Sequence, residues 1–224
     1  MRFLLFCNHG YGQPFQAAFR AWCARRGVTD HFVVHSLRGI VAGGPADRPL
    51  ARWLSRRAGI AAASRLAFLT KQAILVDDVN SEAFARACLP AESAVQGIVA
   101  GFNQIFSAAT IARFDHLYNF HPSLLPYYRG PVPSFWCIRN GETATGITLH
   151  EVGPRIDDGR ILWQEEAPVT TQDADEMDRI LARRGAAMMP AVLDGLLEGR
   201  PLPESRVEAD RVYRQRVGYR SFPR

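Results

Sequence analysis

Short apolar segments alternate with amphipathic ones along the first half of the chain. The segments Arg2–Cys7, Asp30–Ser36 and Ala73–Val76 have the length and apolar content of buried strands. Between the first two, a stripe of large apolar side chains predicts a helix over Pro14–Arg26. The stripe consists of Phe15, Phe19 and Trp22. Strands connected by helices indicate a largely parallel sheet.

The same alternation continues toward the middle of the chain. A helix is expected over Asn80–Cys88, with Asn80 or Ser81 as its N-cap. Gln96–Ala100 and Asp115–Phe120 read as central strands. Residues 38–71 are less regular and rich in arginine, and helices are expected within Leu50–Leu66.

The second half begins with a short helix at Phe135–Arg139, followed by strands at Gly146–Val152 and Ile161–Trp163. A long helix should start near Asp173, where acidic residues suit the positive end of the helix dipole. Pro190 should kink or interrupt that helix. The whole pattern predicts an α/β, Rossmann-like fold with a mostly parallel central sheet flanked by helices.

No second domain or repeat is evident. We expect one catalytic domain over residues 1–199 and an arginine-rich tail over residues 200–224. No apolar run approaches the length that crosses a bilayer, and Phe3–Cys7 is too short for a signal peptide. The sequence therefore predicts a cytoplasmic protein without membrane contact.

Composition adds little about partners. The net charge of +5 comes almost entirely from arginine, which suits phosphate and carboxylate groups but is also common on solvated surfaces. The four cysteines, Cys7, Cys23, Cys88 and Cys137, are not spaced as metal ligands or as a disulfide framework. We expect them to be reduced and mostly buried, and we expect no metal.

The most specific chemistry lies in the run from Asn119 to Pro126. Asn119 and His121 are two positions apart on an expected strand, so their side chains should share one face near its carboxyl end. Ligands bind at that edge of open α/β sheets. Downstream, Asp157 or Asp158 on a polar loop could supply a carboxylate, and an acid beside His121 would raise the pKa of the imidazole.

These motifs resemble the folate-dependent formyltransferase family, which includes methionyl-tRNA formyltransferase and the sugar N-formyltransferases. The resemblance rests on four motifs and is strong over residues 101–169. They are Asn-x-His-Pro-Ser-Leu-Leu-Pro, Tyr-Arg-Gly-Pro, Asn-Gly-Glu-Thr-Ala-Thr-Gly-Ile-Thr-Leu-His and Ile-Asp-Asp-Gly-x-Ile-Leu. It implies that Asn119, His121 and Asp157 form the catalytic site. Because Asp158 is adjacent, the catalytic acid could instead be one residue later, although Asp157 fits the motif better.

The resemblance also implies a folate pocket. One wall would be the segment after the Gln96–Ala100 strand, where the backbone binds the pterin, and the other the loop Val152–Ile156. The residues concerned are Phe102, Asn103, Gln104, Ile105, Phe106, Val152, Gly153 and Ile156. Plain core packing explains Phe106 equally well. The first loop and the segment after Pro126 would face the acceptor substrate through His9, Tyr11, Tyr127 and Arg129.

The implied activity is an N-formyltransferase that uses 10-formyltetrahydrofolate and needs no metal. A nucleotide-linked amino sugar is the first choice of acceptor amine, and hydroxyornithine, a siderophore precursor, is the alternative. Nucleic acid is not expected as a partner, because the tRNA enzyme carries a further carboxyl-terminal domain. The oligomeric state is open, with a homodimer as one possibility. A formyltetrahydrofolate hydrolase and a non-catalytic nucleic-acid binder are the other readings.

Overall fold

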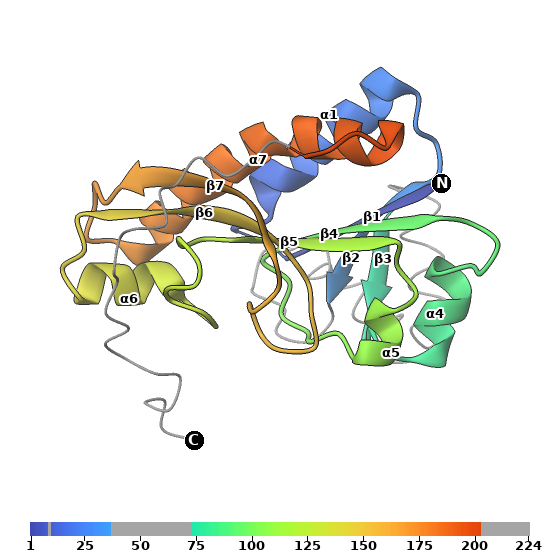
Figure 1. Ribbon diagram of the computed structural model, residues 1–224, viewed down its shortest axis with the longest axis horizontal. Helices are drawn as coiled ribbons and strands as arrows, with labels where there is room; N and C mark the ends of the chain where they lie inside the picture. Colours follow the sequence, from blue (N-terminus) through green and yellow to red (C-terminus); the bar gives the residue numbers. More distant parts are fainter. Residues whose placement is uncertain (9, 37–72, 203–224) are drawn as a thin grey trace, which may run out of the picture. The chain divides into compact units, whose positions relative to one another are not determined.

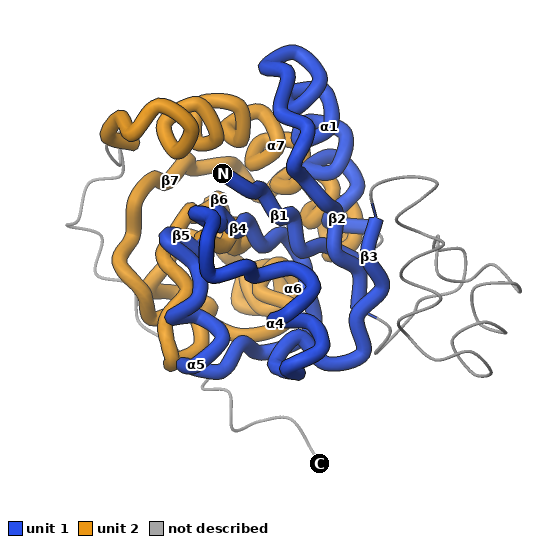
Figure 2. Tube along the Cα trace, turned by 90° about the vertical axis from the view of Figure 1, so that its right-hand side faces the viewer, with its two compact units in different colours: residues 1–117 blue, residues 118–224 orange. Residues whose placement is uncertain are grey.

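A computed structural model describes residues 1–8, 10–36 and 73–202 (Figure 1). The chain divides into two compact units, residues 1–117 and 118–224 (Figure 2). His9, the arginine-rich segment within residues 38–71 with its expected helices, and the tail from residue 203 lie outside the described residues.

The first unit contains a parallel sheet with the strand order β3-β2-β1-β4. Its strands are β1 (Arg2–Cys7), β2 (His31–Ser36), β3 (Ala73–Val76) and β4 (Val95–Ala100). Its helices are α1 (Gln13–Arg26), α4 (Glu82–Cys88) and α5 (Ala108–Ile111). The four strands and the two longer helices were predicted, whereas α5, a single turn, was not.

Packing in the first unit follows the apolar pattern. The stripe of α1 is fully buried, and the ring of Trp22 meets that of Phe3 on β1 edge-on, with 5.2 Å between the ring centroids. Ser81 is the N-cap of α4, where its side chain accepts a hydrogen bond from the Phe84 main-chain nitrogen.

The second unit contains an antiparallel set of strands in the order β5-β6-β7. Its elements are β5 (His116–His121, whose first two residues belong to the first unit), α6 (Pro133–Arg139), β6 (Ala144–Glu151), β7 (Ile161–Pro168) and α7 (Ala174–Glu198). Phe120 and Leu149 pair across β5 and β6 and are buried, which gives this unit an apolar face.

Helix α7 begins as predicted, because the Asp173 side chain accepts from the main-chain nitrogens of Asp175 and Glu176. Pro190 was expected to kink or interrupt the helix, and an interruption is contradicted, because the helix runs through Pro190 to Glu198. Proline removes one hydrogen-bond donor, but the apolar face around it is fully buried. That face includes Met189, Val192 and Leu193.

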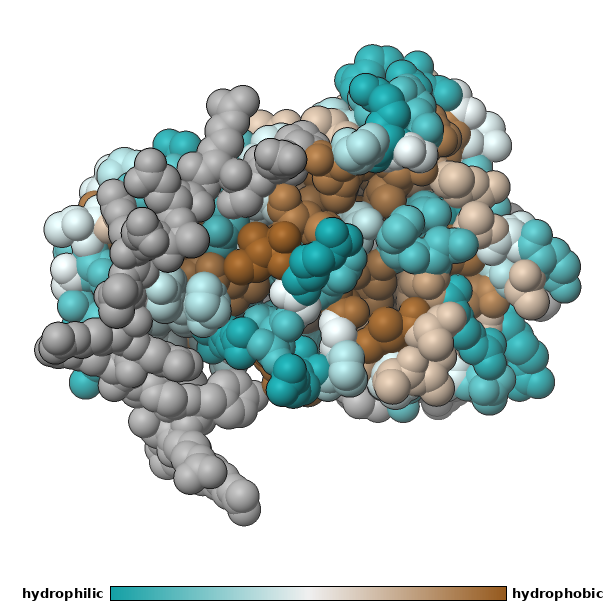
Figure 3. Space-filling view, viewed as in Figure 1, coloured by the Kyte–Doolittle hydropathy of each residue, from teal (hydrophilic) through white to brown (hydrophobic). Residues whose placement is uncertain are grey.

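Large exposed apolar side chains are few among the described residues. They are Met1, Ile105, Val132, Phe135 and Ile156. Figure 3 shows apolar surface interspersed with hydrophilic residues on the face that it draws. None of the described helices has the length and apolarity that crossing a bilayer requires.

Candidate active site

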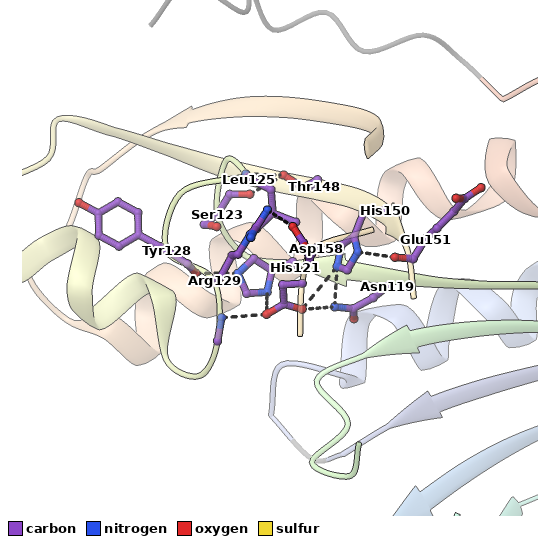
Figure 4. Close-up of polar contacts among 12 residues, drawn as sticks. Asn119, His121, Ser123, Leu125, Tyr128, Arg129, Thr148, His150, Glu151 and Asp158 are labelled. Carbon is purple, nitrogen blue, oxygen red and sulfur yellow. Dashed lines mark hydrogen bonds and ion pairs between the residues drawn. The ribbon is translucent and has the colours of Figure 1, made fainter. Parts of the chain in front are cut away.

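The pairing register of β5 and β6 brings four polar side chains onto one face. Asn119 lies opposite His150, and His121 lies opposite Thr148. Residues two apart on a strand, and residues directly opposite on an antiparallel partner, project to the same side. The predicted shared face of Asn119 and His121 is confirmed, and β6 adds a second imidazole to it (Figure 4).

The loop after His121 is fixed by one buried hydroxyl. Thr148 Oγ1 donates to the Ser123 main-chain oxygen at 2.6 Å and accepts from the Leu125 main-chain nitrogen at 3.1 Å. It also accepts from Gln164 Nε2 at 2.9 Å, which uses all its hydrogen-bonding capacity. Ser123 Oγ in turn donates to the Tyr127 main-chain oxygen at 2.7 Å. These bonds hold the Ser-Leu-Leu-Pro segment against β6.

His121 is almost fully buried, and its two nitrogens have different partners. Nε2 donates to the Tyr128 main-chain oxygen at 2.9 Å, and Nδ1 lies 3.5 Å from Asp157 Oδ2. Burial lowers the pKa of His121, and the opposing effects of Asp157 and the Tyr128 carbonyl do not reverse that direction. The net shift is therefore opposite to the predicted one, because desolvation outweighs the neighbouring acid.

Asp157 lies at the centre of the cluster. Its Oδ2 accepts from the Gly130 main-chain nitrogen at 2.8 Å, and its Oδ1 lies 3.4 Å from Asn119 Nδ2 and 3.5 Å from His150 Nε2. Burial alone would raise the pKa of Asp157. The neighbouring imidazoles of His150 and His121 and the Gly130 N–H together lower it to about 2. The carboxylate is therefore ionised at neutral pH.

Asp158 faces a different set of groups. Its two oxygens form ion pairs with Arg129 and with Arg155, the latter at 2.6 Å. The guanidinium of Arg129, a residue expected to face the acceptor, is thus paired with Asp158. Of the two adjacent acids, Asp157 is the one beside Asn119 and His121, which supports the register that the resemblance implied.

Gly159 explains why glycine follows the two acids. A Cβ at this position would lie 1.8 Å from the Glu151 main-chain oxygen. The same oxygen accepts a hydrogen bond from His150 Nδ1 at 2.8 Å. The loop that carries Asp157 can therefore pass over the end of β6 only where a residue has no side chain.

The expected folate segment of the first unit has a mixed character. Phe106 is buried and packs edge-on against Phe6 with 5.0 Å between ring centroids, so core packing accounts for it. Phe102 also packs against Phe6, at 5.4 Å. Gln104 accepts from the Val79 main-chain nitrogen and donates to Ser36 Oγ at 2.6 Å. Because the side-chain amide of Gln104 already makes these hydrogen bonds, a folate contact at this position would be made by the main chain.

The remaining expected contact residues are more accessible. Ile105 is 66% exposed and Asn103 is also exposed, while in the second unit Ile156 is 45% exposed. Val152 and Gly153 are half-buried. Tyr11 packs on Phe15 of α1, with 5.4 Å between the ring centroids, and Tyr127 is half-buried.

Within residues 1–8, 10–36 and 73–202, no group of three or more His, Cys, Asp or Glu side chains has an arrangement that could hold a metal ion. The four cysteines are free and buried, and burial raises the pKa of each thiol, for example that of Cys7 to about 12. Their predicted burial is confirmed.

Three contributors to the cluster were not predicted: Thr148, Gln164 and His150. All three are buried polar residues on β6 or β7. Strand alternation places Thr148 and His150 on one face of β6, but which residues they oppose depends on a pairing register that the sequence did not supply.

Comparison with known proteins shows the family. The model of the formyl transferase family matches residues 66–193, more than half of the chain. Mitochondrial methionyl-tRNA formyltransferase of Mus musculus is 40% identical over 118 residues, or 50% of this chain and 31% of that protein. Methionyl-tRNA formyltransferase of Chloroflexus aurantiacus is 32% identical over 202 residues, or 84% of this chain and 64% of that protein. The chain thus spans only part of these relatives.

A solved structure shows the same fold. The sugar N-formyltransferase of a Shewanella species superimposes with a TM-score of 0.63 at 20% identity, covering 94% of this chain and 75% of that one. The predicted α/β, Rossmann-like formyltransferase fold is confirmed. The chain belongs to the formyl transferase family. Its Asn119, His121 and Asp157 lie together on one side of β5.

Proposed function

We propose that this chain is an N-formyltransferase that moves the formyl group of 10-formyltetrahydrofolate to an amine. The observation that carries the proposal is the ionised, half-buried Asp157 held between Asn119 and His121 in a chain of this family. In the overall reaction a bond forms between the amine nitrogen and the formyl carbon. The bond from that carbon to N10 of the folate breaks, and N10 ends with the proton that the amine loses.

The side chains have distinct roles in this reaction. The N–H of Asn119 that lies 3.4 Å from Asp157 Oδ1 in the free protein turns to the formyl oxygen and stabilises the negative charge that develops there. A preorganised donor of this kind lowers a barrier by about 3–4 kcal/mol. Asp157 takes the amine proton and passes it to Nδ1 of His121, 3.5 Å away, from which it goes on to N10 of the departing folate. Burial keeps His121 neutral beforehand, so Nδ1 has a lone pair to receive that proton.

Folate recognition is proposed for the two loops that the resemblance singled out. These are residues 102–106 in the first unit, and Val152, Gly153 and Ile156 in the second. Each loop exposes an isoleucine, Ile105 in one and Ile156 in the other, and a pterin ring binds to apolar surface of that type. We propose that His9, Tyr11, Tyr127 and Arg129 contact the acceptor.

Two acceptors follow from different observations. A nucleotide-linked amino sugar remains our first proposal, and the structural likeness to a sugar N-formyltransferase supports it. The sequence relatives are named methionyl-tRNA formyltransferases, which makes methionyl-tRNA the second candidate and keeps nucleic acid open as a partner. We further propose a cytoplasmic protein whose residues 1–199 form the catalytic domain.

The proposal is tested by measuring tetrahydrofolate release from 10-formyltetrahydrofolate. The acceptors are a set of nucleotide-linked amino sugars, methionyl-tRNA and hydroxyornithine, each compared with a reaction that lacks an acceptor. We expect release only with an amine, and mass spectrometry should find the formylated product. Equal release without any acceptor would indicate a hydrolase instead.

Two variants link this activity to the cluster. Asn119→Ala and His121→Ala should each lower kcat by about a hundredfold or more while the far-ultraviolet circular dichroism stays unchanged. Near wild-type turnover in either variant would remove that residue from the mechanism.

A further inference from the structure

We propose that His150 is a positioning residue of this site: as a neutral imidazole protonated on Nδ1, it holds the amide of Asn119 in its working orientation beside Asp157. The inference rests on the proposed formyl transfer and extends it to a residue outside the Asn-x-His motif. His150 is buried on β6, directly opposite Asn119 on β5 (Figure 4).

The hydrogen bond on one side of the ring fixes its tautomer. Nδ1 of His150 lies 2.8 Å from the Glu151 main-chain oxygen, and a carbonyl oxygen can only accept. The Nδ1 atom therefore carries a hydrogen. In the neutral ring, Nε2 then has a lone pair and can serve as an acceptor.

The other side of the ring meets the amide of Asn119. Nδ2 of Asn119 lies 3.1 Å from His150 Nε2 and 3.4 Å from Asp157 Oδ1. Rotating the amide by half a turn would place its oxygen against the ionised carboxylate, which repels it. The carboxylate thus directs the NH2 group inward, and Nε2 of neutral His150 accepts one of its two hydrogens.

A second proton on His150 would break this arrangement. Nε2 would become a donor facing the Asn119 NH2 group at 3.1 Å and would turn instead to Asp157 Oδ1, 3.5 Å away. Asn119 would lose the partner that orients it.

The groups around the ring come from several elements. Asn119 and His121 lie on β5, with the two imidazole rings 6.3 Å apart between centroids, and Asp157 lies on the loop before β7. Glu151, the next residue of β6, has its carboxylate paired with Arg160 at 2.7 Å, and its charge also acts on Tyr118 of β5. Among the residues that the structure describes, Asp157 is therefore the one carboxylate within ion-pair distance of His150 Nε2.

The experiment compares two substitutions of His150 in the full chain. His150→Gln keeps an acceptor near the position of Nε2 but cannot take up a proton. His150→Phe keeps a ring and has no acceptor. With the acceptor amine that wild type uses, we expect His150→Phe to lower kcat by about 30-fold, and His150→Gln to stay within about fivefold of wild type. KM for 10-formyltetrahydrofolate should change less than about twofold in both. His116→Gln, at an exposed position of β5, serves as the matched control.

Rescue by glutamine is a readout that loss of packing alone would not give, because glutamine and phenylalanine both replace the imidazole and only glutamine restores an acceptor. Wild-type turnover in His150→Phe, or a His150→Gln variant as impaired as His150→Phe, would overturn the proposal.

Nitrogen-15 NMR of the free protein tests the tautomer without any turnover. We expect His150 to show a protonated Nδ1 and an unprotonated Nε2 near pH 7.5. A hydrogen on Nε2 would overturn the proposal even if formyl transfer is confirmed. If the tautomer is as expected but the protein transfers no formyl group to any acceptor, the proposed function is refuted and the inference about His150 is not. If His150→Phe does not fold, the glutamine variant and the NMR measurement still decide.

Discussion

Nε2 of His121 donates to the main-chain oxygen of Tyr128 at 2.9 Å, and Tyr128 holds that oxygen in place from a left-handed backbone conformation with φ of 56°. Non-glycine residues rarely adopt this conformation. The side chain of Tyr128 is anchored at the same time, since its hydroxyl donates to Glu142 Oε1 at 2.5 Å. The loop after β5 therefore fixes which nitrogen of His121 faces Asp157.

Replacing Thr148 tests how far this loop controls the site. Thr148→Val removes the hydroxyl that bonds Ser123, Leu125 and Gln164, and leaves buried polar groups without a partner. We expect a loss of about 2–4 kcal/mol in the free energy of unfolding, measured by urea denaturation, together with lower kcat. Thr148→Ser keeps the hydroxyl and should lose only about 1 kcal/mol. A loss in Thr148→Val no larger than that in Thr148→Ser would show that the hydroxyl contributes no more than the methyl group.

The two adjacent acids should differ in their effect on turnover. Asp157→Asn removes the charge beside His121, so kcat should fall by about a hundredfold or more. Because Asp157 raises the pKa of His121 against the larger effect of burial, its loss should also move the acid limb of the pH profile to lower pH. Asp158→Asn breaks ion pairs with Arg129 and Arg155, whose side chains are exposed, and should change kcat by less than about fivefold. A dead Asp158→Asn with an active Asp157→Asn would place the catalytic acid one residue later.

Two glycines near the acids provide a matched pair. Gly159→Ala would force a Cβ against the Glu151 main-chain oxygen and should destabilise the protein by about 1–3 kcal/mol. Turnover should fall as well, because that oxygen is the partner of His150 Nδ1. Gly153→Ala meets no atom within 4 Å and should stay within about 0.5 kcal/mol of wild type. Thermal unfolding of both variants decides the point.

Acid should destabilise the protein in two steps. His121 has a folded pKa below its unfolded value of 6.5, so the unfolded chain gains protons first and stability falls as pH drops below 6.5. Asp157 has a folded pKa of about 2 against 3.8 unfolded, so its stabilisation of about 2 kcal/mol is present above pH 3.8 and is lost as pH falls toward 2.

The first step can be assigned by mutation. In His121→Asn the loss of unfolding free energy between pH 7.5 and 5 should be smaller than in wild type, by urea denaturation. A remainder should persist, since burial also lowers the pKa of His31. The assignment would be wrong if wild type and variant lost the same amount over this range.

The sequence was most informative where geometry is local. The spacing of Asn119 and His121 predicts a shared face because strand alternation has a period of two. The same reasoning could not find the role of His150, which depends on the register of β5 against β6. The direction of the His121 pKa shift also required the structure, because a neighbouring acid is visible in the sequence and the depth of burial is not. That Pro190 does not interrupt α7 has a related reason, since tertiary packing supports the helix around it.

The register of β5 on β6 has a consequence for how this chain can vary. A slip of one residue would send Thr148 and His150 to the opposite face and bring Leu149 and Glu151 toward Asn119 and His121. A single-residue insertion or deletion in the connection between His121 and Thr148 would therefore either be absorbed in its loops or abolish the site outright. Selection for activity would therefore also preserve the alignment of β5 with β6. Insertions and deletions between these strands should be far rarer than substitutions.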